Sequence, residues 1–209
     1  MNPFAAPVTT DAELTAIYGE AAPRAWSKDI GLLDDVARTL IAGSPMVLVA
    51  SHDAEGRCDV TPRGGQPGFV AALDDRHLAI GDATGNKRLD TLRNILATGR
   101  AGLLFLVPGR DQTLRVNGAA CVTADPVVLA AVPAVGKPPR TAIVVRVEEV
   151  YAHCPKAFVR SRLWDPESWT TAEALPSPAA VMLAHLRDPQ RTLAEEEEYL
   201  AEALRSRLA

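Results

Sequence analysis

Three segments between residues 59 and 118 decide the fold, and they read DVTPRGGQPGF (59–69), GDATGNKRLDTLRNIL (81–96) and GLLFLVPGRDQTLRVNG (102–118). Runs typical of strands alternate in them with Gly-rich, cationic turns. Arg63, Lys87, Arg88 and Arg115 fall where strands are expected to end or helices to begin. This arrangement predicts a sheet that holds a compact anionic ligand, and a nucleotide phosphate is the best match.

Strand and helix patterns occupy most of the remaining chain. We expect strands at 46–50, 58–61, 69–72, 77–81, 101–108, 113–123 and 141–151. We expect helices at 11–21, 87–98, 155–163, 179–186 and 193–208. A further helix should run from an N-cap at Ser27 to residue 41, and a small one should begin at residue 126. Because the strand connections are mostly of hairpin length, the sheet should be largely antiparallel. Six or seven such strands predict a mainly β (α+β) barrel with peripheral helices.

Local signals define several element boundaries. Gly99 is expected to cap the helix that precedes it, and Pro62 to end the strand before it. Asp125 precedes a proline in the manner of an N-cap. Thr192 and Glu195 have the spacing of a capping box.

Composition excludes several classes of protein. The chain has 209 residues, 47% of them hydrophobic, and a formal net charge of -4, so no basic field for nucleic acid is present. No apolar run is long enough to span a membrane, and the N-terminus lacks the pattern of a secretory signal. The three cysteines, an odd number at wide spacing, favour a reducing cytoplasm and argue against disulfides and a metal site. Cys154 is expected to be a small buried side chain.

Two turns have the chemistry of an anion site. Residues 85–88 (Gly-Asn-Lys-Arg) follow a predicted strand and open a predicted helix, where free N–H groups and two cations could bind a phosphate. Arg63 would project beside them, next to two glycines that permit close backbone approach. Solvated arginines and lysines on surface turns remain the alternative for both.

Two further segments carry polar side chains with several possible roles. Thr113, Arg115 and Asn117 share one face of a strand, which could be a solvent face, a subunit interface or a binding wall. Lys156, Arg160 and Trp164 recur at helical spacing and could cover a planar anionic ligand or form a salt-bridged rim. No side chain is identified as a catalytic acid, base or nucleophile.

Taken together with CPKAFVRSRLW (154–164), these segments resemble the pyridoxamine 5'-phosphate oxidase-like FMN-binding proteins, and most closely an uncharacterised bacterial FMN-dependent subgroup. The resemblance covers residues 44–164. It implies a split β-barrel homodimer with FMN at the subunit interface, and Thr113 and Arg115 reaching the cofactor from the partner. The residues that it implies in cofactor binding are Thr61, Pro62, Arg63, Asp82, Ala83, Thr84, Asn86, Lys87, Arg88, Thr113, Arg115 and Trp164.

The resemblance also implies a division of the chain and a function. An N-terminal helical segment (1–43) and a C-terminal helical extension (165–209) would flank a flavin-binding core (44–164). FMN would carry electrons between a reduced donor and a small organic acceptor or dioxygen. The alternatives are a flavin-storage protein without turnover, a deazaflavin-dependent reductase, and a cofactor-free dimer whose cationic loop meets anionic surfaces. The acidic tail (Glu195–Glu198) does not align with the C-terminal tryptophan and arginine segment of the oxidases proper.

Overall fold

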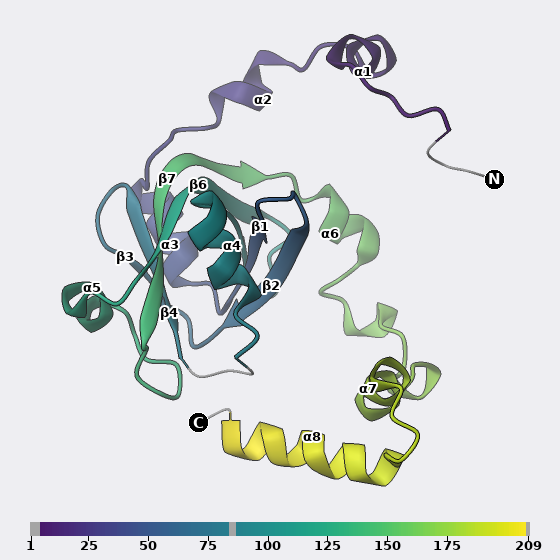
Figure 1. The fold of residues 1–209 in the computed structure, drawn as a ribbon. Coiled ribbons are helices and arrows are strands. Elements are labelled where there is room, and N and C mark those ends of the chain that lie inside the picture. The colour runs from purple at the N-terminus through teal and green to yellow at the C-terminus, as the bar shows by residue number, and fades with distance from the viewer. Residues whose placement is uncertain (1–4, 84–86, 208–209) are drawn as a thin grey trace.

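The computed structural model describes residues 5–83 and 87–207, and seven strands in these ranges form one sheet. The strands are β1 (Met46–His52), β2 (Cys58–Gly64), β3 (Val70–Ala72), β4 (His77–Asp82), β5 (Arg100–Leu106), β6 (Thr113–Thr123) and β7 (Thr141–His153). Their order is β2-β1-β5-β6-β7-β4-β3, and every neighbouring pair is antiparallel. The predicted mainly β fold is confirmed, and the sheet curls into the half-barrel of a split β-barrel (Figure 1).

The two faces of the sheet differ in burial. On β1 and β5 the inward side chains are Val47, Val49, Leu103 and Phe105, each at most 1% exposed. The side chains between them point outward and are half-buried or exposed, and they are Met46, Leu48, Leu104 and Leu106. The strands therefore have a dry concave core and an outer face that is also apolar.

Two helices fill the concave side of the sheet. Helices α3 (Asp35–Ala42) and α4 (Asp90–Thr98) lie across it in Figure 1. Ile41 of α3 and Ile95 of α4 are each 1% exposed and belong to the same core as the strands. Burying a side chain of this size contributes about 1.5–3 kcal/mol. A smaller helix, α5 (Pro126–Ala131), packs on β7 beside a second apolar cluster.

A β-bulge bends the longest strand pair. Asn117 lies opposite Glu149, but Gly118 lies opposite Val147, so Glu148 is an extra residue on β7. A Cβ atom at Gly118 would lie 1.9 Å from the carbonyl oxygen of Arg146. Only glycine fits this close approach, and the bulge increases the twist that curls the sheet.

The N-terminal part of the chain differs from the prediction. The prediction of one helix from Ser27 to residue 41 is wrong, because Ser27 ends a short helix, α2 (Pro23–Ser27), and α3 begins at Asp35. The N-cap of α3 is Asp34, whose Oδ1 accepts a hydrogen bond of 2.7 Å from the Ala37 N–H.

Hydrogen bonds to strand β7 explain why residues 28–30 do not form the expected helix. Strand β7 extends beyond the last residue that pairs with β4, Arg146, and its far end has a free edge. The Ile30 N–H donates to the Val150 carbonyl (3.2 Å), and the Val150 N–H donates to Asp29 Oδ1 (2.8 Å). Tertiary hydrogen bonds to β7 thus replace the helix that the local pattern predicts.

Other local predictions hold or need a small correction. Gly99 caps α4 with a left-handed φ of 65°, and the Val127 N–H donates to Asp125 Oδ1 (2.8 Å), as expected. The capping box at Thr192 is also present. Strand β2 continues past Pro62 to Gly64, because β2 is an edge strand and tolerates a residue without an N–H.

The remaining helices lie outside the sheet. They are α1 (Asp11–Tyr18), α2, α6 (Lys156–Ser161), the 3₁₀ turns η1 (Pro166–Ser168) and η2 (Ala172–Ala174), α7 (Pro178–Leu186) and α8 (Leu193–Arg207). Figure 1 shows α1 and α2 beyond one side of the sheet and α7 and α8 beyond another. Helices α7 and α8 pack on each other, and Glu196, 1% exposed, lies 2.5 Å from Arg191 Nε.

Two observations bear on the class of protein. None of the helices in the described ranges has both the length and the apolar composition that a bilayer crossing requires. All three cysteines are exposed, so the prediction that Cys154 is buried is wrong. Cys154 follows the end of β7, and the N–H of Lys156, the first residue of α6, donates to its sulfur at 3.4 Å.

The bulge provides a test of the fold. Gly118→Ala should lower the free energy of unfolding by about 3 kcal/mol, because the new methyl group collides with backbone that flanks the bulge. Urea denaturation measures this change. Gly43→Ala is the matched control, since a Cβ there meets only ordinary contacts of 3.4 Å or more. Equal stability of the two variants would show that the bulge is more flexible than its geometry indicates.

Candidate functional site

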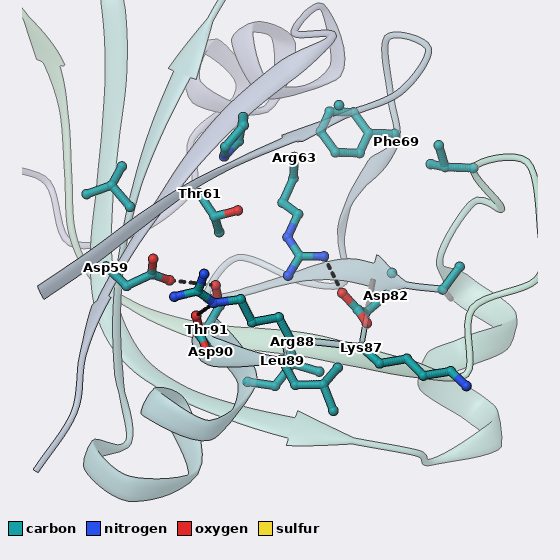
Figure 2. A pocket seen from close by; sticks show the side chains of 17 residues that line it. Asp59, Thr61, Arg63, Phe69, Asp82, Lys87, Arg88, Leu89, Asp90 and Thr91 are labelled. Carbon is teal, nitrogen blue, oxygen red and sulfur yellow. Dashed lines mark hydrogen bonds and ion pairs between the residues drawn. The ribbon is translucent and has the colours of Figure 1, made fainter. Parts of the chain in front are cut away.

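A cavity of about 570 Å³ opens where the two edges of the curled sheet approach each other. Strand β2, the end of β4 and the first turn of α4 form its walls (Figure 2). The lining residues are Asp59, Val60, Thr61, Pro62, Arg63, Gly64, Phe69, Gly81, Asp82, Ala83, Lys87, Arg88, Leu89, Asp90, Thr91, Leu92 and Val135. The volume is typical of a site for a small organic ligand.

One ion pair crosses the cavity. Arg63 points inward from β2, because it lies opposite Val47 of the core, and its Nη1 donates to Asp82 Oδ1 at the end of β4 (Figure 2). The side chains are 26% and 11% exposed, so the pair is shielded from water. Arg63 Nε is buried and has no hydrogen-bond partner among the described residues. This leaves one donor of a partly shielded guanidinium without a hydrogen-bond acceptor.

A strained turn leads into α4. Lys87 and Leu89 both have a φ of 61°, which costs a non-glycine residue about 1–2 kcal/mol. Leu89 is the N-cap and supplies no side-chain hydrogen bond, so α4 begins at Asp90 without a cap from that residue. Strain of this kind is often kept where a site needs it. The turn directs the start of α4 into the cavity.

The two adjacent cations diverge. In Figure 2 Lys87 and Arg88 extend in opposite directions from the turn. Arg88 Nε donates to Asp90 Oδ2, whereas Lys87 forms no ion pair with a carboxylate among the described residues. Local geometry pairs Arg88 with Asp90, and the expectation that both cations hold one anion together stays a prediction.

Polar groups beneath the cavity tie α4 to the strands. Thr91 Oγ1 donates to Asp59 Oδ2 (3.0 Å), and Asn94 Nδ2 donates to Ser51 Oγ (3.1 Å). Thr91, Asn94 and Ser51 are buried, so these hydrogen bonds are shielded from competition with water. They hold the first two turns of α4 at a fixed height against β1 and β2.

The opposite wall is apolar. Phe69 and Val135 lie there, and a Cβ at Gly65 would come within 2.8 Å of the Phe69 Cβ and 3.0 Å of Val135. A glycine at 65 thus allows the chain to pass closely behind both side chains. The cavity combines one apolar wall with one charged wall, as expected of a site for a ligand with a ring and an anionic group.

The structure gathers seven of the residues that sequence analysis assigned to cofactor binding. They are Thr61, Pro62, Arg63, Asp82, Ala83, Lys87 and Arg88. Thr84 and Asn86 lie outside the described residues. Thr113, Arg115 and Trp164 do not line the cavity of their own chain. Their part in cofactor binding stays a prediction.

Trp164 has a different setting from the one its spacing predicted. Helix α6 ends at Ser161 and Arg162 is left-handed, so Trp164 does not continue the face of Lys156 and Arg160. Its ring stacks on Phe158 with centroids 5.8 Å apart, and its Nε1 donates to the Arg110 carbonyl (2.8 Å). This contact fixes the start of the C-terminal extension to the β5–β6 turn.

Sequence reasoning missed several lining residues. Asp59 could have been found, because it alternates with Thr61 and Arg63 along β2 and therefore faces the same way. Phe69 follows a glycine-rich turn and carried a weaker signal. Val135 comes from the connection between α5 and β7, and no sequence signal marks it as a lining residue, since only the tertiary fold brings it to the cavity.

Comparison with known proteins identifies the family of the core. A family model described as pyridoxamine 5'-phosphate oxidase matches residues 33–154, more than half of the chain. The match includes all strands and the described lining of the cavity. No curated protein matches the chain.

Solved structures with a similar fold are distant in sequence. HupZ of Group A Streptococcus is 20% identical, with 57% of this chain and 93% of that chain covered and a TM-score of 0.47. General stress protein 26 of Bacillus anthracis is 12% identical, with 55% and 88% covered and a TM-score of 0.42. HutZ of Vibrio cholerae, described as a heme storage protein, is 13% identical, with 56% and 89% covered and a TM-score of 0.38.

The ion pair across the cavity provides a second prediction. Asp82→Asn should destabilise the protein by about 2 kcal/mol, because it leaves the Arg63 guanidinium shielded and without its counter-ion. Arg63→Met should be less costly in the Asp82→Asn background than alone. Urea denaturation of the two single variants and the double variant measures the coupling. Strictly additive effects would mean that the pair does not join the two sheet edges.

Proposed function

The chain belongs to the pyridoxamine 5'-phosphate oxidase family, and from this premise we propose that it is a flavin-dependent oxidoreductase whose cofactor, FMN, binds in the cavity between β2, β4 and α4. The observation that carries the proposal is the meeting of a shielded arginine donor, a lysine and the start of α4 in one cavity. A flavin supplies two-electron transfer when bound, and the protein supplies position and electrostatics.

The residues present fit the phosphate of FMN. Arg63 Nε is a buried donor without a partner among the described residues, and Lys87 lines the same cavity. The first N–H groups of α4 add partial positive charge at the same end, because the N-cap Leu89 provides no side-chain acceptor for them. Arg63, Lys87 and the α4 backbone would bind the phosphate, and Arg88 would contribute charge from its pair with Asp90.

The apolar wall fits the ring of a flavin. Phe69 and Val135 present carbon surface toward the cavity, and Gly65 keeps them close to the chain behind. A wall of this kind excludes water from one side of a bound ring. The same features accommodate a deazaflavin, which shares the tricyclic ring, so the cavity supports a flavin-type cofactor more strongly than it distinguishes the two.

The outer face of the sheet supports a homodimer. Pro62, Leu48 and Leu104 lie side by side across β2, β1 and β5, since Pro62 pairs with Leu48 and Leu48 with Leu104. Met46, 42% exposed, extends the same apolar band. A band of this kind on a central sheet is typical of a subunit interface. Because Pro62 also lines the cavity, a partner on this band would lie at the cavity mouth.

We further propose the division of the chain into an N-terminal helical segment (1–43), a flavin-binding core (44–164) and a C-terminal extension (165–209). The core carries the cavity and the apolar band, and the small-molecule substrate would enter from the open side of the cavity. Flavin storage without turnover and deazaflavin-dependent reduction remain the alternatives that experiment distinguishes.

The visible spectrum tests the proposal. Purified protein loaded with FMN should absorb near ~450 nm, lose the band with a nicotinamide donor and regain it in air.

Lys87→Ala combined with Arg88→Ala should weaken FMN affinity at least about tenfold, since charge-assisted bonds to the phosphate are lost. Arg24→Ala combined with Arg205→Ala, which removes two exposed cations outside the cavity lining, is the matched control.

Each other outcome has a distinct meaning. A band that no donor bleaches would favour storage, and uptake of a deazaflavin in preference to FMN would favour the reductase. A protein that takes up neither cofactor contradicts the proposal. Unchanged affinity of the Lys87 and Arg88 double variant would remove these residues from the phosphate site.

The apolar band predicts the oligomeric state. Met46→Glu combined with Leu104→Glu should convert a dimer into a monomer in analytical ultracentrifugation, because two charges would be buried at the interface. Val127→Glu, at an exposed position of α5 away from the band, should leave the dimer intact. A dimer that persists in the first variant would place the interface elsewhere.

A further inference from the structure

A second group of basic side chains lies on the outer face of β6 and β7, and no part of it lines the cavity. Arg115 of β6 lies opposite Tyr151 of β7, and the neighbouring pair is Thr113 and His153. Arg115 Nη1 donates to the Tyr151 hydroxyl (3.0 Å), and its guanidinium carbon is 5.6 Å from the ring centroid. A second cation, Lys28, approaches the same ring.

Lys28 reaches this group through the unexpected course of the N-terminal segment. Residues 28–30 follow the free end of β7, and Lys28 Nζ donates to the Ala152 carbonyl (3.2 Å). Its ammonium lies 5.0 Å from the Tyr151 ring centroid. The structure therefore brings two cations from distant parts of the chain within 6 Å of one aromatic ring.

The two cations of this group donate hydrogen bonds to neutral oxygens, the Ala152 carbonyl and the Tyr151 hydroxyl. Among the described residues, neither Lys28 nor Arg115 forms an ion pair with a carboxylate. The carboxylates at adjoining positions are engaged elsewhere: Glu149 accepts from Asn117 Nδ2 (2.7 Å), and Asp29 accepts from the Val150 N–H. Two like charges held near each other repel, and a bound anion would offset that repulsion.

His153 lies in the same positively charged surroundings. Its Nδ1 is buried and has no hydrogen-bond partner among the described residues. Burial lowers the pKa of His153 below its ordinary value, and the positive charges of Arg115 and Lys28 lower it further. This unpartnered ring nitrogen lies beside two cations whose hydrogen bonds go to neutral groups, so a bound anion would ease the electrostatic cost at His153 without needing to contact its Nδ1.

We propose that Lys28, Arg115 and Tyr151, with His153 beside them, form a binding site for the phosphate or carboxylate group of a small anionic ligand. Arg115 offers a planar set of donors that matches either group, and Lys28 adds a point charge. The Tyr151 ring holds the two cations in place and presents a flat surface beside them. This site is separate from the cavity that we assign to the flavin.

The sheet register relates the two sites. One row of paired residues crosses the outer face from Pro62 through Leu48 and Leu104 to Arg115. With strands about 4.8 Å apart, Arg115 lies about 14 Å from Pro62 along this row.

The test uses inorganic phosphate and the full chain without flavin. Proton NMR follows the pH titration of the four histidines, with His153 assigned from the His153→Gln variant, in phosphate and in chloride of equal ionic strength. Phosphate should raise the pKa of His153, because a bound anion offsets the two cations that disfavour the imidazolium. His52 and His77 are internal references for general salt effects.

Variants separate a binding site from a structural contact. Arg115→Met and Lys28→Met should each raise the pKa of His153 in chloride and weaken phosphate binding at least about tenfold. Arg160→Met, which removes an exposed cation from α6, should change neither. A parallel titration with acetate distinguishes the ligand groups, since the stronger response names phosphate or carboxylate.

The contrary result is equally clear. If phosphate and acetate leave the His153 pKa where chloride does, while Arg115→Met still moves it, the cluster only anchors the N-terminal segment and the proposal is wrong. Because these titrations need no cofactor, a protein that binds phosphate at His153 but takes up no flavin would contradict the proposed function alone.

Discussion

The ion pair between Arg63 and Asp82 joins two edges of the curled sheet, β2 and the end of β4, that do not pair with each other among the described strands. Strand β2 has β1 as its neighbour and β4 has β7 and β3, so the curled sheet stays open between them. An open sheet with a dry concave side needs other groups to close it. Helices α3 and α4 supply apolar surface, and the ion pair supplies a bridge across the cavity.

That opening explains why charge and carbon surface meet in the cavity. The edge strand β2 alternates Asp59, Thr61 and Arg63 toward the inside, where a central strand would carry aliphatic residues. The first turn of α4 lies against these side chains through Thr91. The same alternation turns Pro62 outward onto the apolar band. One strand thus contributes both to the proposed flavin site and to the proposed dimer interface. A substitution on one face of β2 is therefore expected to affect the other face as well.

Much of the fold could be predicted because its signals are local. The strands follow from apolar alternation, and the caps at Gly99, Asp125 and Thr192 follow from hydrogen bonds within a few residues. The helix expected after Ser27 failed because the free end of β7 binds residues 28–30, and no local pattern encodes that edge. Left-handed backbone at Lys87 and the carboxylate of Asp90 turn the side chains of Lys87 and Arg88 apart, and their joint part in phosphate binding stays a prediction.

The sequence by itself determined the antiparallel mainly β class, the positions of the strands and the cationic turn at the start of α4, because periodicity and turn chemistry act over a few residues. Only the tertiary structure decided which of these parts meet. The curl of the sheet brought Arg63 to Asp82 and Val135 to the cavity, and the register across the outer face aligned Pro62 with Arg115. The free end of β7 drew Lys28 to Tyr151. These contacts join residues far apart in the chain, and they follow from packing and strand pairing that no short segment contains.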